Sequence, residues 1–167
     1  MSDIMLGVDV TVVKTATEGP EWPLGSKYTD PKTGHEYRYI NADTGIAAVG
    51  DFLTPTLADT DAPWSVVPAA TAGIDIAGVS VSIIAAEGFG WMLTDGKKTL
   101  CNVADAVVAG DMLGTTTTAG RLDAITFTTT AATLAQLTAG FKSQRGCRVL
   151  ALTDGTAGNT ATVQIRS

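Results

Sequence analysis

Strand-length apolar segments, separated by turn-forming residues, follow one another along almost the whole chain. The last of them is the clearest, because Ala161, Val163 and Ile165 alternate with polar residues at the two-residue period of a half-buried strand. Many short strands with turn signals between them are typical of sandwiches and barrels. We therefore predict a mainly β fold, a compact β-sandwich or β-barrel-like domain with long loops. A chain of 167 residues is long enough to stabilise such a domain by its own core.

Two turn signals divide the middle of the chain. The segment Asp30–Gly34 predicts a hairpin turn, because its proline presets φ and its glycine accepts a positive φ. A strand is expected directly after it, over His35–Ile40. The dipeptide Asp95-Gly96 predicts a second tight turn, which would reverse the chain between the alternating segments Phe89–Leu93 and Thr99–Val103.

Three segments depart from this pattern. Ile4–Lys14 is rich in β-branched residues and predicts an N-terminal strand, so we expect an arm or strand over residues 1–18 and one β-rich domain over residues 19–167. Residues 54–73 are rich in Pro, Ala and Asp and predict a long loop. Thr130–Lys142 has apolar residues at a helical period, so we expect at most one short helix, at about 130–142.

One motif occurs twice. Ala47–Leu53 (AAVGDFL) is similar to Val107–Leu113 (VVAGDML), and an Asn and an Asp precede each copy. We expect two similar β substructures packed in one core, at about residues 35–55 and 88–115; chance similarity in an Ala-, Gly- and Asp-rich chain is the alternative. In each copy the glycine permits a tight turn, and the aspartate after it is expected to cap nearby backbone N–H groups.

The chain has few charged residues, and more of them are acidic than basic. Charged residues make up 17% of the sequence, against about 25% in typical globular domains, which predicts a surface partly covered by partners. The net charge of −6 comes from 11 basic and 17 acidic residues. The basic clusters, Lys97-Lys98 and the trio Lys142, Arg145 and Arg148, are expected to be solvated loop charges. We therefore predict no nucleic-acid partner.

Membrane and export signals are also missing from the sequence. No apolar run approaches the roughly 20 residues of a membrane span, so we predict no membrane partner. Acidic residues stand near the N-terminus where a signal peptide has basic ones. We expect the chain to be made in a cytoplasm.

Residues that could support catalysis are few. His35 is the only histidine, stands beside the predicted hairpin and is expected to be a surface residue; a Ser-His-Asp or Cys-His centre would need it. Cys101 and Cys147 are expected to be reduced core residues, with a disulfide as the alternative. Asp59 and Asp61 lack the glycine and terminal glutamate of a calcium loop. We predict no catalytic residue, no cofactor and no metal site, and a protein that is not an enzyme.

The three tryptophans differ in context. Trp91 alternates with apolar neighbours and is predicted to be a core residue. Trp22 and Trp64 lie next to prolines in expected loops. Both could pack under a loop of the same chain or anchor a contact with another subunit, and the sequence leaves these alternatives open.

Two C-terminal blocks carry a family resemblance. Gly88–Asp111 joins a Gly-Phe-Gly-Trp strand, a Thr-Asp-Gly-Lys turn and the second copy of the repeated motif. Arg145–Gly155 and then Ala161–Arg166 are two further strand segments. Together these blocks resemble bacteriophage head decoration proteins, also called capsid-stabilising or cement proteins. The resemblance covers roughly residues 74–167, with a looser match over Tyr37–Leu53.

The resemblance implies a structural virion protein, made in the host cytoplasm, that binds the outer surface of an assembled phage capsid and stabilises it. The implied partners are the major capsid protein and further copies of this chain in a homotrimer. A trimer would match the threefold positions of an icosahedral shell. The alternative is a carbohydrate- or host-surface-binding module displayed on a phage or bacterial particle, which loop tryptophans near Asp and Asn would serve.

Two features predict the partner-facing surface. The N-terminal segment Ile4–Lys14 is expected to be an arm that pairs with a sheet edge of the capsid or of a sister subunit. The two loop tryptophans are expected at subunit contacts. The candidate interface residues are Ile4, Leu6, Val8, Val10, Val12, Trp22 and Trp64.

Overall fold

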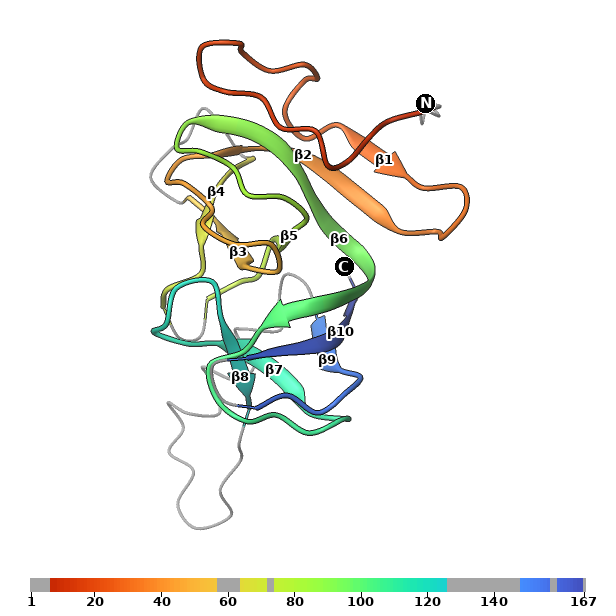
Figure 1. Cartoon of the computed structure of the whole chain (residues 1–167), viewed down its shortest axis with the longest axis vertical. Coiled ribbons are helices and arrows are strands. Elements are labelled where there is room, and N and C mark those ends of the chain that lie inside the picture. Colours follow the sequence, from red (N-terminus) through yellow and green to blue (C-terminus); the bar gives the residue numbers. More distant parts are fainter. Residues whose placement is uncertain (1–6, 57–63, 72–73, 126–147, 157–158, 167) are drawn as a thin grey trace.

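All regular structure in the computed structural model is β, over the residues that it describes: 7–56, 64–71, 74–125, 148–156 and 159–166 (Figure 1). The mainly β, barrel-like fold predicted from the sequence is confirmed. The helix predicted at 130–142 lies outside the described residues. The strands are β1 (Lys27–Thr29), β2 (Glu36–Ala42), β3 (Phe52–Pro55), β4 (Ser65–Pro68), β5 (Gly78–Ser80), β6 (Gly88–Asn102), β7 (Met112–Thr115), β8 (Leu122–Ala124), β9 (Arg148–Ala151) and β10 (Thr160–Arg166).

The first group of strands closes into a barrel. The order is β2-β4-β3-β5-β6, and β6 pairs back with β2. β2 and β4 are parallel, and the other neighbours are antiparallel. Residues of these strands and the bridged pair Ile46 and Ile84 form a buried cluster of Ile40, Ala42, Ile46, Leu53, Val66, Ile84 and Met92. β4 lies inside the long loop predicted at 54–73, so that prediction is wrong there; buried Val66 makes the segment a strand despite its proline-rich surroundings.

β6 joins this barrel to the rest of the molecule. It runs for 15 residues through Asp95-Gly96, so the tight turn predicted there is wrong. Its first half pairs with β2 and β5, and its second half pairs with β10. Figure 1 shows it passing from the upper strands to the lower ones. Gly96 has a φ of +133°, and a Cβ there would lie 2.5 Å from the ring of His35. Packing of His35 therefore explains this glycine.

The second group of strands repeats the first. β6 is followed in the sheet by β10, β9, β7 and β8. Val103, directly after β6, forms a parallel bridge with Leu122 of β8. This bridge corresponds to the parallel pair Ala42 and Val66 between β2 and β4 in the first barrel. The inward residues of β10, Ala161, Val163 and Ile165, are buried as the sequence predicted. They belong to a second core cluster that also contains Phe52, Val79 and Leu93 from the first group.

The repeated motif makes the same turn in both groups. The glycines of Gly50-Asp51 and Gly110-Asp111 have φ of +89° and +101°. Asp51 Oδ2 accepts a hydrogen bond from the Ala48 N–H at 3.0 Å, and Asp111 Oδ2 accepts one from the Val108 N–H at 2.8 Å. The predicted capping role of the aspartates is therefore confirmed.

Each turn is also held by one residue of a neighbouring strand. The Gly50 N–H donates to the carbonyl of Ser80, whose own N–H donates to the Asp51 carbonyl. Gly110, Asp111 and Ala151 form the same pair of bonds. The two copies of the motif thus occupy matching places, beside β5 in one strand group and beside β9 in the other.

Candidate functional site

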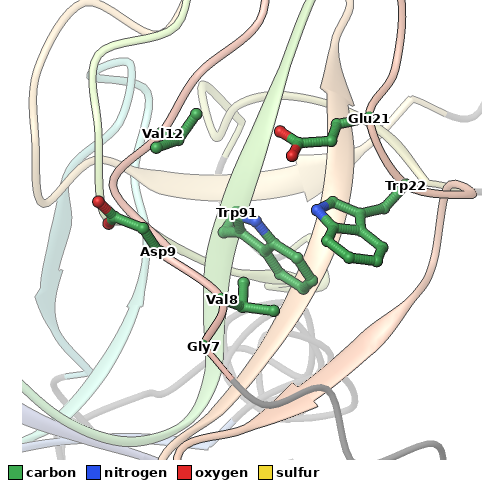
Figure 2. A pocket seen from close by; sticks show the side chains of 7 residues that line it. All are labelled: Gly7, Val8, Asp9, Val12, Glu21, Trp22 and Trp91. Carbon is green, nitrogen blue, oxygen red and sulfur yellow. The ribbon is translucent and has the colours of Figure 1, made fainter.

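A pocket of about 180 Å³ lies where the N-terminal segment crosses β6 (Figure 2). Three predicted interface residues line it: Val8 and Val12 from the N-terminal segment, and Trp22 from the loop that follows. The complete lining is Gly7, Val8, Asp9, Val12, Glu21, Trp22 and Trp91. Because it brings these residues together, we take this pocket as the candidate site.

Trp91 forms the buried floor of the pocket. It is 1% exposed, so its predicted place in the core is confirmed. It stands on β6 next to Met92 and points to the opposite face of the strand, away from the Ile40–Met92 cluster. Tyr39 packs edge-on against it at 5.1 Å between ring centroids, and Tyr28 does so at 6.1 Å. The aromatic neighbours hold the indole in a single orientation.

Trp22 is half-buried and lies beside Trp91 in the wall of the pocket (Figure 2). The Glu21 N–H beside it donates a hydrogen bond to Tyr39 Oη at 3.1 Å. Burial raises the pKa of the Tyr39 hydroxyl, so this oxygen stays protonated at neutral pH. The bond ties the loop that carries Glu21 and Trp22 to β2.

The opposite wall comes from the N-terminal segment, which is held without being a strand. Asp9 Oδ1 accepts hydrogen bonds from the Thr11 N–H at 2.9 Å and the Thr11 hydroxyl at 2.7 Å. The Ser82 hydroxyl donates to the Thr11 carbonyl at 3.0 Å. Lys14 exchanges two backbone hydrogen bonds with Phe89, at 2.9 and 2.8 Å. Of the predicted N-terminal arm or strand, the strand is wrong over residues 7–14, because the aspartate turn bends the chain and only Lys14 pairs with a strand. An arm stays a prediction.

The pocket carries negative charge. The hydroxyl and the backbone amide of Thr11 donate to Asp9 and lower the pKa of its carboxyl, which is therefore ionised at neutral pH. Glu21 supplies the second carboxylate. No Lys or Arg lines the pocket, and no described basic group forms an ion pair with either acid.

The remaining predicted interface residues lie elsewhere. Trp64 is half-buried, and the Arg38 guanidinium carbon stands 5.1 Å from its ring centroid. The same indole fills the space where a Cβ on Gly25 would lie. Trp64 thus packs within its own chain, while a contact with another subunit stays a prediction. Val10 is half-buried outside the pocket lining. Ile4 and Leu6 lie outside the described residues.

The residues considered for catalysis are not assembled into a centre in the described part of the chain. His35 is half-buried beside β2, and its Nε2 accepts a hydrogen bond from the Lys97 N–H at 3.3 Å. Cys101 is a free, buried thiol, and burial raises its pKa to about 12, which keeps it protonated at neutral pH. No three His, Cys, Asp or Glu side chains among the described residues are placed to hold a metal ion. The described part of the chain contains no helix that is long and apolar enough to cross a membrane.

Asp9 and Glu21 are the site residues that sequence reasoning missed. They stand 12 positions apart in turn-rich sequence and 70 or more positions before Trp91. No spacing in the sequence relates them to that tryptophan. The one available signal was the dipeptide Glu21-Trp22, an acid adjacent to a loop aromatic.

A second surface feature lies in the lower strand group. Met112 of β7 and Leu150 of β9 are cross-strand partners and are 46% and 39% exposed. Leu152, two residues further on, is 37% exposed. Their strand neighbours Leu113 and Val149 are buried. We call Met112, Leu150 and Leu152 the C-terminal apolar face.

Comparison with protein-family models found no match to this chain, and comparison with curated proteins found none either.

Proposed function

We propose that this chain is a structural protein of a phage virion, which binds the outer surface of the assembled capsid and stabilises it as a homotrimer. The observation that carries the proposal is the C-terminal apolar face. Its members Met112 and Leu150 are exposed on strands whose other faces are buried in the core. Apolar side chains fixed side by side on a rigid sheet favour burial against another protein.

The composition and the resemblance support the same proposal. A chain with 17% charged residues keeps few charges to solvate its surface. The blocks that resemble head decoration proteins form β6, the second repeated turn, β9 and β10. These blocks make up most of the lower strand group, which carries the apolar face. Its burial by sister subunits or by the capsid would add interface area across the shell.

Binding to heads is the first test. Purified chain should cosediment with assembled heads of its source phage at a fixed, saturating ratio, and should raise the temperature at which the heads break. In solution it should sediment as a trimer. Leu150→Asp should reduce trimer formation or head binding at least tenfold, because the carboxylate would be desolvated in the contact.

Thr117→Asp is the matched control, since it adds the same charge to an exposed loop residue. Both variants should retain the β signature in circular dichroism. Equal head binding and equal oligomeric state for Leu150→Asp and the unmodified chain would refute the C-terminal apolar face as a contact surface.

Deletion of residues 1–14 tests the N-terminal segment separately. This segment is held to the barrel at Ser82 and Phe89 by few bonds, so it can be removed without opening the core clusters. We expect the truncated chain to fold and to bind heads at least tenfold more weakly. Unchanged head binding, measured by the same cosedimentation, would show that the segment is no capsid-binding arm.

A carbohydrate- or host-surface-binding module is the second candidate. The observation in its favour is the half-buried Trp22 beside the carboxylates of Asp9 and Glu21, because aromatic rings and acids are common in sugar-binding sites. Binding on a glycan array that Trp22→Ala removes would favour this candidate. Head binding at fixed ratio without glycan binding favours the capsid function.

A further inference from the structure

The pocket between Trp22 and Trp91 has walls that attract positive charge. The indoles of Trp22 and Trp91 lie next to one another in its lining (Figure 2), and Trp22 is the more exposed of the two. The face of an indole is negative, and tryptophan attracts cations more strongly than other aromatic residues do. Val8 and Val12 supply aliphatic contacts beside the rings. Such walls suit a ligand with an alkyl stem and a positive end.

The charges at the pocket favour the same ligand. Asp9 and Glu21 both line it, from the N-terminal segment and from the Trp22 loop. No basic group among the described residues pairs with them, so their attraction for a cation is not already satisfied. An entering cation would gain mainly from the Glu21 carboxylate, because Asp9 Oδ1 already accepts two hydrogen bonds from Thr11 and its carboxylate points away from the indoles (Figure 2). An anion would be repelled, and a neutral group would gain only contact.

The size of the pocket limits the ligand to a small group. Its volume of about 180 Å³ is below the roughly 300–1,000 Å³ of pockets for drug-sized ligands. Its walls are held by the Glu21–Tyr39 bond on one side and the Thr11–Ser82 bond on the other. Because these walls are held in place, the pocket accommodates one side-chain end more readily than a chain of sugar rings.

We propose that the Trp22–Trp91 pocket binds the cationic end of one Lys or Arg side chain that projects from a partner protein. The pocket residues carry this inference whether or not the partner is a capsid protein. A net charge of −6 on the chain adds a general attraction for a basic partner surface.

The test is a titration of the full chain labelled with 15N at its tryptophans. The probes are Nα-acetyl-L-lysine methylamide and Nα-acetyl-L-arginine methylamide, and the neutral control is Nα-acetyl-L-norleucine methylamide. We expect saturable shifts of the Trp22 and Trp91 indole N–H signals with the two cations and weaker shifts with norleucine. Glu21→Gln should reduce cation affinity about two- to fivefold, the strength of an exposed charge interaction.

Asp75→Asn is the matched control. It removes the same charge from an exposed carboxylate in the segment beside β7 and should leave the affinity unchanged. Equal shifts with norleucine, an equal loss in Asp75→Asn and Glu21→Gln, or shifts caused by methyl glycosides and not by the cations would each overturn the proposal. Because this titration uses no heads, its result is separate from that of the cosedimentation, and either proposal can fail alone.

Discussion

Gly50→Ala should lower the free energy of unfolding by about 3 kcal/mol or more. Gly50 has a φ of +89°, where an L side chain is strained. A Cβ there would also collide with the backbone carbonyl of Leu100 and lie 3.1 Å from the Cα of Cys101. Neither group can move easily, because the Asn102 N–H donates to the Gly50 carbonyl at 3.1 Å and holds the turn against the end of β6.

Gly110→Ala is the control that the repeat supplies. Gly110 has the same place in the second copy of the motif and a φ of +101°, but among the described residues no atom beyond its two chain neighbours lies within 4 Å of its Cβ position. The free energy of unfolding of this variant should fall by only about 1–2 kcal/mol, the cost of the backbone strain that an L side chain adds at this φ. Urea denaturation of both variants, followed by circular dichroism, measures the difference. Equal losses would contradict the close approach of Leu100 to the first turn.

Trp91→Ala should destabilise the chain by about 3–5 kcal/mol, the usual cost of removing a large buried aromatic side chain. The indole is 1% exposed and is packed by Tyr39 at 5.1 Å between ring centroids. Its loss would leave a cavity against β2 and β6 and would remove the floor of the Trp22–Trp91 pocket. Chemical denaturation measures the stability, and the indole signal of Trp22 reports the change in the pocket.

Trp22→Ala is the control for this prediction. The same residue type is removed, but Trp22 is half-buried in a loop, so the loss should be about 1 kcal/mol or less. Similar losses of stability for the two variants would contradict the assignment of Trp91 to the core and of Trp22 to the pocket wall.

The two Gly-Asp turns and strand β6 fix the arrangement of the two strand groups. In each strand group a Gly-Asp turn caps itself and pairs with one neighbouring residue, Ser80 in β5 or Ala151 in β9. β6 belongs to both groups and brings their cores together, since Leu93 packs in one cluster and Met92 in the other. A strand whose two faces serve two clusters leaves little freedom for them to move apart.

Local rules explain what the sequence predicted correctly. The alternation in β10, the hairpin turn before β2 and the capping by the two aspartates each depend on residues only a few positions apart. Trp91 was also predicted to be buried from the alternation of apolar residues around it, although β6 is buried on both faces from Gly90 to Thr94. Periodicity and turn chemistry report such short-range relations directly.

Asp95-Gly96 shows where these rules stop. A turn dipeptide permits a reversal without requiring one, and here Asp95 pairs with Glu36 while Gly96 pairs with Ile165. Partners some 60 and 70 residues away decide that the strand continues. The N-terminal segment shows the opposite case. Over residues 7–14 it is rich in β-branched residues, yet only Lys14 pairs with a strand.

By itself, the sequence determined the β character of the chain, the hairpin turn before β2, the two Gly-Asp turns and the inward face of β10, because these depend on neighbours along the chain. Only the tertiary structure decided that β6 crosses between two strand groups and that Asp9, Glu21 and Trp22 surround Trp91. These arrangements depend on pairing and packing between distant residues, whose free energies exceed the preference of any local segment.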